Sequence, residues 1–413
     1  MRWRQLLTGA LLLGIGAGGG AVPVMRRAAG GAPVSVHTVA VGTGPLAVVV
    51  DAATGRAFVL TRANTVAVID TRRAIVLRTV PVPGAIAPDY APSPQLLTLD
   101  ARTGRVFVLR PFAHAMTALD ARTGAVVGHT PLAPNPVLVA VDTTQGRVFV
   151  VSGDRGRVDI LDARTGHRQR TVALPDLHQA TGVSSAISDA SPPSPTAMAV
   201  DERTSRLFIV TSSPTDHYGT NLGHGSLTVI DTQRGAILCT TSQGVFPRTL
   251  TVDVTSGHVF VADDRPTDST TPPPGDVTMR DVRTGARLGM VHVGNTTSAL
   301  ATDGATGHLF VLDPGTPGIV RVLDTRSGQV RATVRVGDNP VALAIDALSA
   351  RVDVANQDGA SVSMLDARVG TVLHTVGVGQ GPDAIAVDAG TGRVVVANGS
   401  GNNVSLIDAP AQG

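Results

Sequence analysis

One short pattern recurs along the whole chain and constrains its fold more than any other feature. An aliphatic run ends in Asp, a tight turn with Thr-Gly-Arg or a close variant follows, and a second aliphatic run begins, as in AVVVDAATGRAFVL at 47–60. Asp side chains bond to backbone amides two residues on, and Gly accepts a positive φ, so each copy predicts a β-hairpin. The first runs end at Asp51, Asp100, Asp142, Asp201, Asp253, Asp303, Asp346 and Asp388.

Each hairpin is followed by two further strand-like runs. The third run also ends in Asp and often continues with Arg-Thr-Gly, as in DARTG at 120–124, and the fourth run resembles AIVLRTVPV at 74–82. The period is about 42 residues where nothing is inserted, and four strands at that spacing are typical of a β-propeller blade. At one position of the second run, six units carry Phe, which predicts a core slot: Phe58, Phe107, Phe149, Phe208, Phe260 and Phe310.

The two ends of the repeat array complement each other. The last unit stops after its third run, at SLID (405–408), whereas Val34–Val41 resembles a fourth strand without a preceding unit. An open ring would leave a bare strand edge, so we expect the N-terminal strand to complete the last blade. The prediction is an all-β protein with a single propeller over residues 32–413, made of eight four-stranded blades. Seven blades is the alternative, and it would require one unit to fold outside the ring.

Residues 1–31 have the character of an export segment. Arg2 and Arg4 precede an apolar run from Leu6 to Val24, which is typical of a signal peptide or of a single membrane anchor. Gly19 and Ala21 suit cleavage, whereas the length of the run suits an uncleaved anchor. We therefore expect an exported protein that is periplasmic, on the cell surface or secreted, with membrane contact only through residues 6–24 if they are retained.

Charge gives no reason to expect nucleic acid as a partner. The net charge is +2, from 34 basic and 32 acidic residues. Four of the arginines (Arg2, Arg4, Arg26 and Arg27) precede the first repeat, and without them the balance is 30 − 32 = −2. A nearly neutral repeat region lacks the basic surface that phosphate backbones require.

The repeats resemble the YVTN family of extracytoplasmic β-propeller proteins. The nearest matches to its motif are VVVANGSGNNVSLID at 394–408 and VDVANQDGASVSMLD at 352–366, and the resemblance spans about residues 34–408. It implies a propeller of the cell envelope or of a surface layer. Related propellers include lactonases, lyases and haem d1 domains, but a shared fold does not transfer their chemistry.

Extra residues are concentrated where loops of one propeller face should lie. The spacing between the two Asp residues of a unit is 30 in the fourth unit (201–231) and 28 in the fifth (253–281), against 19–21 elsewhere, and the connector before the fourth unit is also long. Long loops on a rigid scaffold commonly bind partners. The candidate ligand-binding residues on this face are Tyr90, His178, His217, Tyr218, His224 and Arg265.

Two groups of acidic residues bear on a catalytic role. Asp263, Asp264 and Asp268 could hold Ca²⁺ or another divalent metal, although their spacing matches no EF-hand; otherwise we expect no cofactor. Asp353 stands where six other units have Phe, so either that blade is locally exposed or Arg351 or another Arg compensates the charge, and we expect exposure.

The favoured function is a non-catalytic scaffold that recognises an envelope polymer or a protein. The alternatives are a lactonase- or lyase-type enzyme with a metal-assisted site, and a haem d1-like or electron-transfer propeller. The only Glu, Glu202, is expected in a turn on the face opposite the long loops, which counts against a Glu-based site of the lactonase or lyase type. No Cys-x-x-Cys-His motif is present, so no covalently attached c-type haem is expected.

Overall fold

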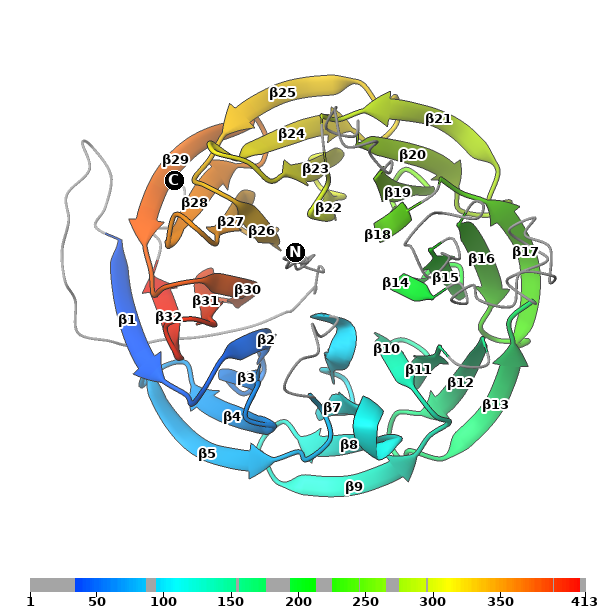
Figure 1. Cartoon of the computed structure of the whole chain (residues 1–413), viewed down its shortest axis with the longest axis horizontal. Coiled ribbons are helices and arrows are strands. Elements are labelled where there is room, and N and C mark those ends of the chain that lie inside the picture. Colours follow the sequence, from blue (N-terminus) through cyan, green and yellow to red (C-terminus); the bar gives the residue numbers. More distant parts are fainter. Residues whose placement is uncertain are drawn as a thin grey trace, which may run out of the picture.

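The computed structural model is a ring of eight antiparallel four-stranded sheets, which radiate from a central axis like blades (Figure 1). It describes residues 34–86, 94–153, 156–175, 194–212, 225–244, 246–264, 275–294, 296–388 and 390–408. The prediction of an eight-bladed all-β propeller is confirmed, and the seven-bladed alternative is wrong. Among the described residues, no helix has the length and apolar character needed to cross a membrane. The expected export segment, residues 1–31, lies outside the described residues.

Every blade has the same order of strands from the axis outward. The inner strands are β2 (Pro45–Asp51), β6 (Leu97–Asp100), β10 (Pro136–Asp142), β14 (Pro195–Asp201), β18 (Phe246–Asp253), β22 (Ala299–Asp303), β26 (Pro340–Asp346) and β30 (Pro382–Asp388). The second strands are β3 (Arg56–Thr61), β7 (Arg105–Arg110), β11 (Arg147–Ser152), β15 (Arg206–Thr211), β19 (His258–Asp264), β23 (His308–Asp313), β27 (Arg351–Asn356) and β31 (Arg393–Asn398).

The third strands are β4 (Thr65–Asp70), β8 (Ala115–Asp120), β12 (Arg157–Asp162), β16 (Ser226–Asp231), β20 (Asp276–Asp281), β24 (Ile319–Asp324), β28 (Ser361–Asp366) and β32 (Asn403–Asp408). The outer strands are β5 (Ile75–Pro81), β9 (Val126–Pro131), β13 (Arg168–Ala173), β17 (Ala236–Ser242), β21 (Arg287–His292), β25 (Val330–Arg335), β29 (Thr371–Gly377) and β1 (Ser35–Ala40). Two short 3₁₀ helices, η1 (Pro94–Leu96) and η2 (Pro111–Ala113), lie in blade 2. Blade 1 is β2–β5, and blade 8 is β30–β32 with β1.

The N-terminal strand closes the ring, as the sequence predicts. β1 pairs antiparallel with β32, with Ser35 opposite Asp408 and Ala40 opposite Asn403. Arg393 forms an ion pair with Asp408 and also donates to the backbone carbonyl of Thr71 in blade 1. The closure therefore joins the first and last blades through both a strand ladder and a buried guanidinium.

Asp residues at the strand ends form the turns. In the turn after β8, Asp120 Oδ1 accepts hydrogen bonds from the backbone N–H groups of Arg122 (3.1 Å) and Thr123 (2.7 Å). Gly124 follows with a φ of 70°, a conformation that costs glycine little. Equivalent bonds to Asp51, Asp253 and Asp388 confirm that these carboxylates are structural.

The core lies between neighbouring blades and is aliphatic with a ring of phenylalanines. All six Phe residues of the predicted slot have exposed fractions of 0–1%. Around Phe58 and Phe107, for example, side chains from blades 1, 2 and 3 form one continuous apolar cluster. Each blade therefore depends on its neighbours to bury its faces.

First-turn side chains tie consecutive blades together. Arg206 in blade 4 donates to the carbonyl of Val282 in blade 5 at 2.9 Å. His258 and His308 take the place of Arg in the next two blades, and each ring Nδ1 lies within 2.8 Å of a carbonyl of the following blade. A neutral imidazole N–H makes the same bond as a guanidinium, which explains why His replaces Arg at these positions.

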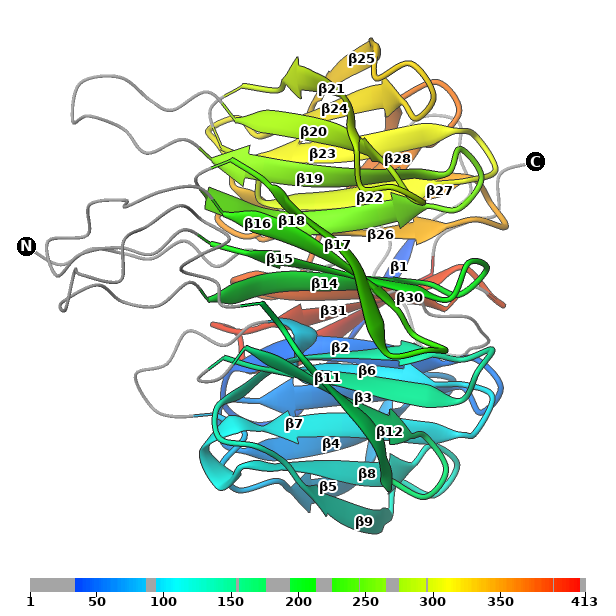
Figure 2. The ribbon, with the colours of Figure 1, turned by 90° about the vertical axis from the view of Figure 1, so that its right-hand side faces the viewer.

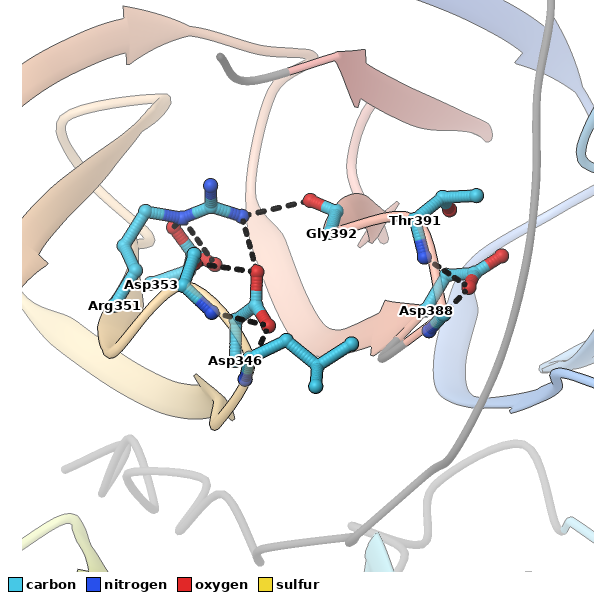
Figure 3. A network of polar contacts seen from close by, with 9 residues as sticks. Asp346, Arg351, Asp353, Asp388, Thr391 and Gly392 are labelled. Carbon is cyan, nitrogen blue, oxygen red and sulfur yellow. Dashed lines mark hydrogen bonds and ion pairs between the residues drawn. The ribbon is translucent and has the colours of Figure 1, made fainter. Parts of the chain in front are cut away.

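Asp353 corrects one expectation from the sequence. We expected local exposure, but its side chain is fully buried in β27. Arg351, two residues earlier on the same face of the strand, donates from Nε to both carboxylate oxygens at 2.8 and 3.1 Å (Figure 3). The same guanidinium lies 3.6 Å from Asp346 and donates to the carbonyl of Gly392 in blade 8. The Phe slot is thus filled by an ion pair, which makes its burial tolerable.

Candidate functional site

The two faces of the ring differ sharply in the length of their connections. On one face, all connections between first and second strands and between third and fourth strands have four residues, as at 52–55, or five, as at 121–125. On the other face, where second strands lead to third and fourth strands lead to the next blade, the connections are 82–96, 174–194, 212–225 and 265–275 besides several short ones. We call this second face the loop face; Figure 2 shows the ring from the side.

Most of the sequence-predicted site residues lie in these long connections, outside the described residues. This holds for the ligand-binding candidates Tyr90, His178, His217, Tyr218, His224 and Arg265, and for the metal candidate Asp268. The strands on either side of these connections all end at the loop face. The sequence predicts that the candidate residues lie on this same face. Of the metal candidates, Asp263 and Asp264 are the last residues of β19.

Asp263 lies in a polar network that crosses blade 5. Its carboxylate accepts from the Gln243 side-chain amide, and Gln243 Oε1 accepts from Arg280 Nε at 2.7 Å. Asp276 lies opposite Asp263 in the strand pairing and contacts His292 on the outer strand. Burial raises the pKa of Asp263 to about 7, against the lowering effect of Gln243 and Arg280. This carboxyl therefore exchanges a proton near neutral pH.

The hydrogen bonds and the charge around Asp263 disfavour coordination of a metal ion. One oxygen of Asp263 is bonded to an amide donor, and the buried guanidinium of Arg280 lies beyond that amide. Among the described residues, no three His, Cys, Asp or Glu side chains gather as a metal site would require. A divalent cation at Asp263 and Asp264 remains a prediction that depends on Asp268.

A largely apolar channel of about 650 Å³ runs along the axis. Inner strands of seven blades line it with side chains such as Val139, Leu250 and Thr302. On one side, the Gln95 side chain of η1 pairs with the backbone N–H and C=O of Met198 in β14, at 3.1 and 2.9 Å, and so braces blade 2 against blade 4.

The only Glu of the chain lines the channel at the face of short turns. Glu202 Oε1 accepts from the Thr143 N–H at 2.7 Å, and the Thr143 hydroxyl lies 2.9 and 3.0 Å from its two oxygens. Its position on the face opposite the long loops agrees with the sequence analysis. Glu202 thus joins blades 3 and 4, and its carboxylate is occupied by that structural role.

A second, polar pocket of about 480 Å³ opens on the loop face where blades 7, 8 and 1 meet. Arg62 comes from the β3–β4 loop, Gln357 and Asp358 from the β27–β28 loop, Gln380 from the connection into blade 8, Asp383 from β30, and Ser400 from the β31–β32 loop. Gln357 Nε2 donates to Asp383 Oδ1 at 2.5 Å. Burial raises the pKa of Asp383, and Gln357 and Arg62 act in the opposite direction.

This pocket is absent from the sequence-predicted site. One signal was available, because Asp383 follows the proline that begins an inner strand, and the same position carries the buried Leu46 in blade 1 and Val341 in blade 7. Blade 3 also has an aliphatic residue there, Val137, whereas blades 4 and 5 carry Thr196 and Arg248. A carboxylate at a position that packs as an aliphatic residue in blades 1, 3 and 7 indicates a local role other than packing. Its closeness to Arg62 and Asp358 could not be seen, because these residues meet only when the ring closes.

Comparisons with known proteins agree on the propeller. The sequence profile described as outer membrane protein assembly factor BamB matches residues 101–265, from blade 2 into blade 5. A search of curated proteins gives no significant match. BamB from Moraxella catarrhalis is a similar structure, 16% identical with a TM-score of 0.57, and the alignment covers 90% of this chain and 100% of that one.

Two other structures have comparable similarity. The computationally designed protein Ika8 is 14% identical with a TM-score of 0.64, over 89% of this chain and 98% of that one. Hydrazine synthase from Kuenenia stuttgartiensis is 15% identical with a TM-score of 0.56, over 76% and 95%. At these identities the likeness concerns the fold, and it establishes the chain as a β-propeller repeat protein.

Proposed function

We propose that the protein is an exported binding scaffold that holds a polypeptide partner of the cell envelope on its loop face. The observation that carries this proposal is the asymmetry of the two faces. Every connection on one face is a minimal turn, whereas all four long connections, 82–96, 174–194, 212–225 and 265–275, leave from the other. Selection for the ring alone would not place them together, whereas a binding surface on one face requires it.

The family match supports a protein as the partner. The matching profile is that of an assembly factor for outer membrane proteins, and it covers the part of the chain that contains the connections 174–194 and 212–225. The apolar segment at 6–24 and the resemblance to YVTN-type envelope propellers favour export of this protein to the cell envelope. An envelope polymer is the other partner class that the sequence leaves open.

The rigid ring suits such a role. Both ends of each long connection are held in strand ladders; Thr211, for example, pairs with Ser226 across the base of one of them. Loops anchored in this way lose less conformational freedom on binding than free segments of equal length. No covalent chemistry is needed for this function.

Site-specific crosslinking in the producing cells tests the proposal. A photoreactive residue would replace Ala63, which is exposed on the loop face, or, as the matched control, Arg326, which is exposed on the opposite face. We expect protein adducts from position 63 only. Replacing both 212–225 and 265–275 with the four-residue turn 357–360 should abolish them while thermal unfolding changes little. Adducts that survive this double replacement, or that form equally from position 326, would contradict the proposal.

A further inference from the structure

The pocket between blades 7, 8 and 1 contains charged side chains of both signs that form no ion pair with one another. Within the described residues, the Arg62 guanidinium and the Asp358 carboxylate make no hydrogen bond or ion pair, although both line the pocket. Asp383 has one bonded oxygen, Oδ1, which accepts from Gln357. Charged groups that surround one pocket without bonding one another are available to a ligand.

Asp263 is held in a similar way, by the Gln243 amide with Arg280 beyond it, but two other buried carboxylates bond directly to a guanidinium. Asp353 is bonded to Arg351 at 2.8 Å, and Asp313 to Arg321 at 2.7 Å. Arg62 and Asp383 face the same pocket and interact electrostatically, yet they form no ion pair. The pocket thus holds an anion and a cation apart, in contrast to the direct ion pairs of Asp353 and Asp313.

Asp383 occupies a β-bulge that recurs at the start of most inner strands. It is the extra residue between β30 and β31, because Pro382 pairs with Asn398 and Ala384 with Ala397, and blades 1, 3, 4, 5 and 7 have the same irregularity. A bulge turns its side chain away from the regular strand direction. Gly399 in the neighbouring loop leaves room for the carboxylate, since a Cβ there would lie 2.1 Å from Asp383 Oδ2.

The charges select among classes of small ligand. A simple anion would bind Arg62 but meet two carboxylates, and a simple cation would bind the carboxylates but meet Arg62. A molecule with both an ammonium and a carboxylate satisfies both signs with charge-assisted hydrogen bonds. The side chains of Gln380 and Ser400 supply further polar contacts, and the volume of about 480 Å³ lies in the usual range for small-molecule sites.

We propose that this pocket binds a small zwitterion of the amino-acid type, with its ammonium group at Asp383 and Asp358 and its carboxylate at Arg62. The ligand is either a free amino acid or a short peptide whose two termini reach both sides of the pocket. The site shares the loop face with the proposed polypeptide surface, but it does not rest on that function, and its test uses no protein partner.

Isothermal titration of the full-length protein with L-alanine and with the dipeptide Ala-Ala tests the proposal and separates the two sources. Propionate, ethylamine and glycerol are the matched ligands with only the negative charge, only the positive charge, or none. We expect saturable binding of at least one zwitterion and affinity at least about tenfold lower for each matched ligand, a difference of about 1.4 kcal/mol.

Two pocket variants and one control variant show which charged group of the ligand binds at Arg62 and which at Asp383. Arg62→Gln should weaken the zwitterion about tenfold and leave ethylamine binding unchanged or tighter, whereas Asp383→Asn should weaken the zwitterion and leave propionate binding unchanged or tighter. Arg326→Gln removes the same charge from the opposite face and should have no effect, and melting temperatures verify that all three variants fold. Absence of saturable zwitterion binding up to about 10 mM, or binding that neither pocket variant changes, would overturn the proposal.

Discussion

Buried carboxylates in this propeller differ by the partner that each one meets. Asp353 bonds directly to the Arg351 guanidinium, and Asp263 bonds to the neutral amide of Gln243, with Arg280 one residue further away. Burial raises the pKa of both groups, to about 6 for Asp353 and about 7 for Asp263. A neutral donor offsets less of the cost of burying a charge than a cation does, so Asp263 is the more easily protonated of the two.

Asp263→Asn should therefore change how stability depends on pH. The pKa of Asp263 is raised in the folded state, from 3.8 to about 7, so the folded state binds the proton more tightly and stability falls as pH rises from about 4 to about 7. Asn mimics the protonated group. We expect the variant to match the parent near pH 4 and to exceed it at pH 8 by at most about 4 kcal/mol.

Melting temperatures recorded from pH 4 to pH 8 measure this difference. Asp324→Asn is the matched control, because the pKa of Asp324 is lowered by its bond to Arg331 and by backbone donors. That carboxylate stabilises the fold when ionised, so its variant should lose stability at pH 8. Equal pH profiles for Asp263→Asn and the parent would show that Asp263 is ionised throughout.

For single residues, the alignment of the repeats predicts where a side chain lies better than it predicts which residue that side chain bonds to. It correctly assigns the turn carboxylates and the six buried phenylalanines, because these have the same neighbours in every unit. It fails at Asp353, because the compensating Arg351 occupies a position that is Arg in most units and usually bonds elsewhere. It also misses the pocket that Arg62 and Asp383 share, because that pocket forms only where three blades meet.

Strand β1 closes the ring by supplying the fourth strand of blade 8. Its Val39 is 7% exposed and packs with side chains of blades 8 and 1, including Val395 and Val59. The structure confirms the sequence prediction for β1. That prediction needed only two observations, namely that the last unit lacks a fourth strand and that the N-terminal strand has no unit of its own. The 3₁₀ helix η1 was not predicted, since its Gln95 bonds to a strand 103 residues away.

Val39→Ala should destabilise the protein by about 2 kcal/mol, because it removes two buried methyl groups and leaves a small cavity. Val330→Ala is the matched control on another outer strand, where the side chain is 46% exposed. Its effect should stay within about 0.5 kcal/mol. Denaturant unfolding of both variants measures the difference, and equal losses would mean that β1 adds no more than an ordinary outer strand.

At the scale of the whole molecule, closure converts a linear array of repeats into a ring. Each blade packs on two neighbours, and first-turn side chains such as Arg206 and His308 bond to the blade that follows. In an open array, stability is a sum of repeat and nearest-neighbour terms, so end repeats can unfold first. A closed ring has no end repeat, and we expect all eight blades to unfold together. The long connections of the loop face therefore leave from strands that the closed ring holds rigidly.

Opening the ring should therefore lower cooperativity as well as stability. Deletion of residues 1–41 removes β1 and its ladder with β32, whereas deletion of residues 1–31 removes only the predicted export segment and leaves β1 intact. By scanning calorimetry, the shorter deletion should unfold in one sharp transition. The longer deletion should give a broader transition at lower temperature, with a van't Hoff enthalpy well below the calorimetric value, since blades 8 and 1 become ends that unfold first. The bare edge of β32 should also make this variant associate at high concentration. If both deletions unfold with the same sharpness, contacts among the inner strands hold the ring together, and β1 serves only to cover an edge.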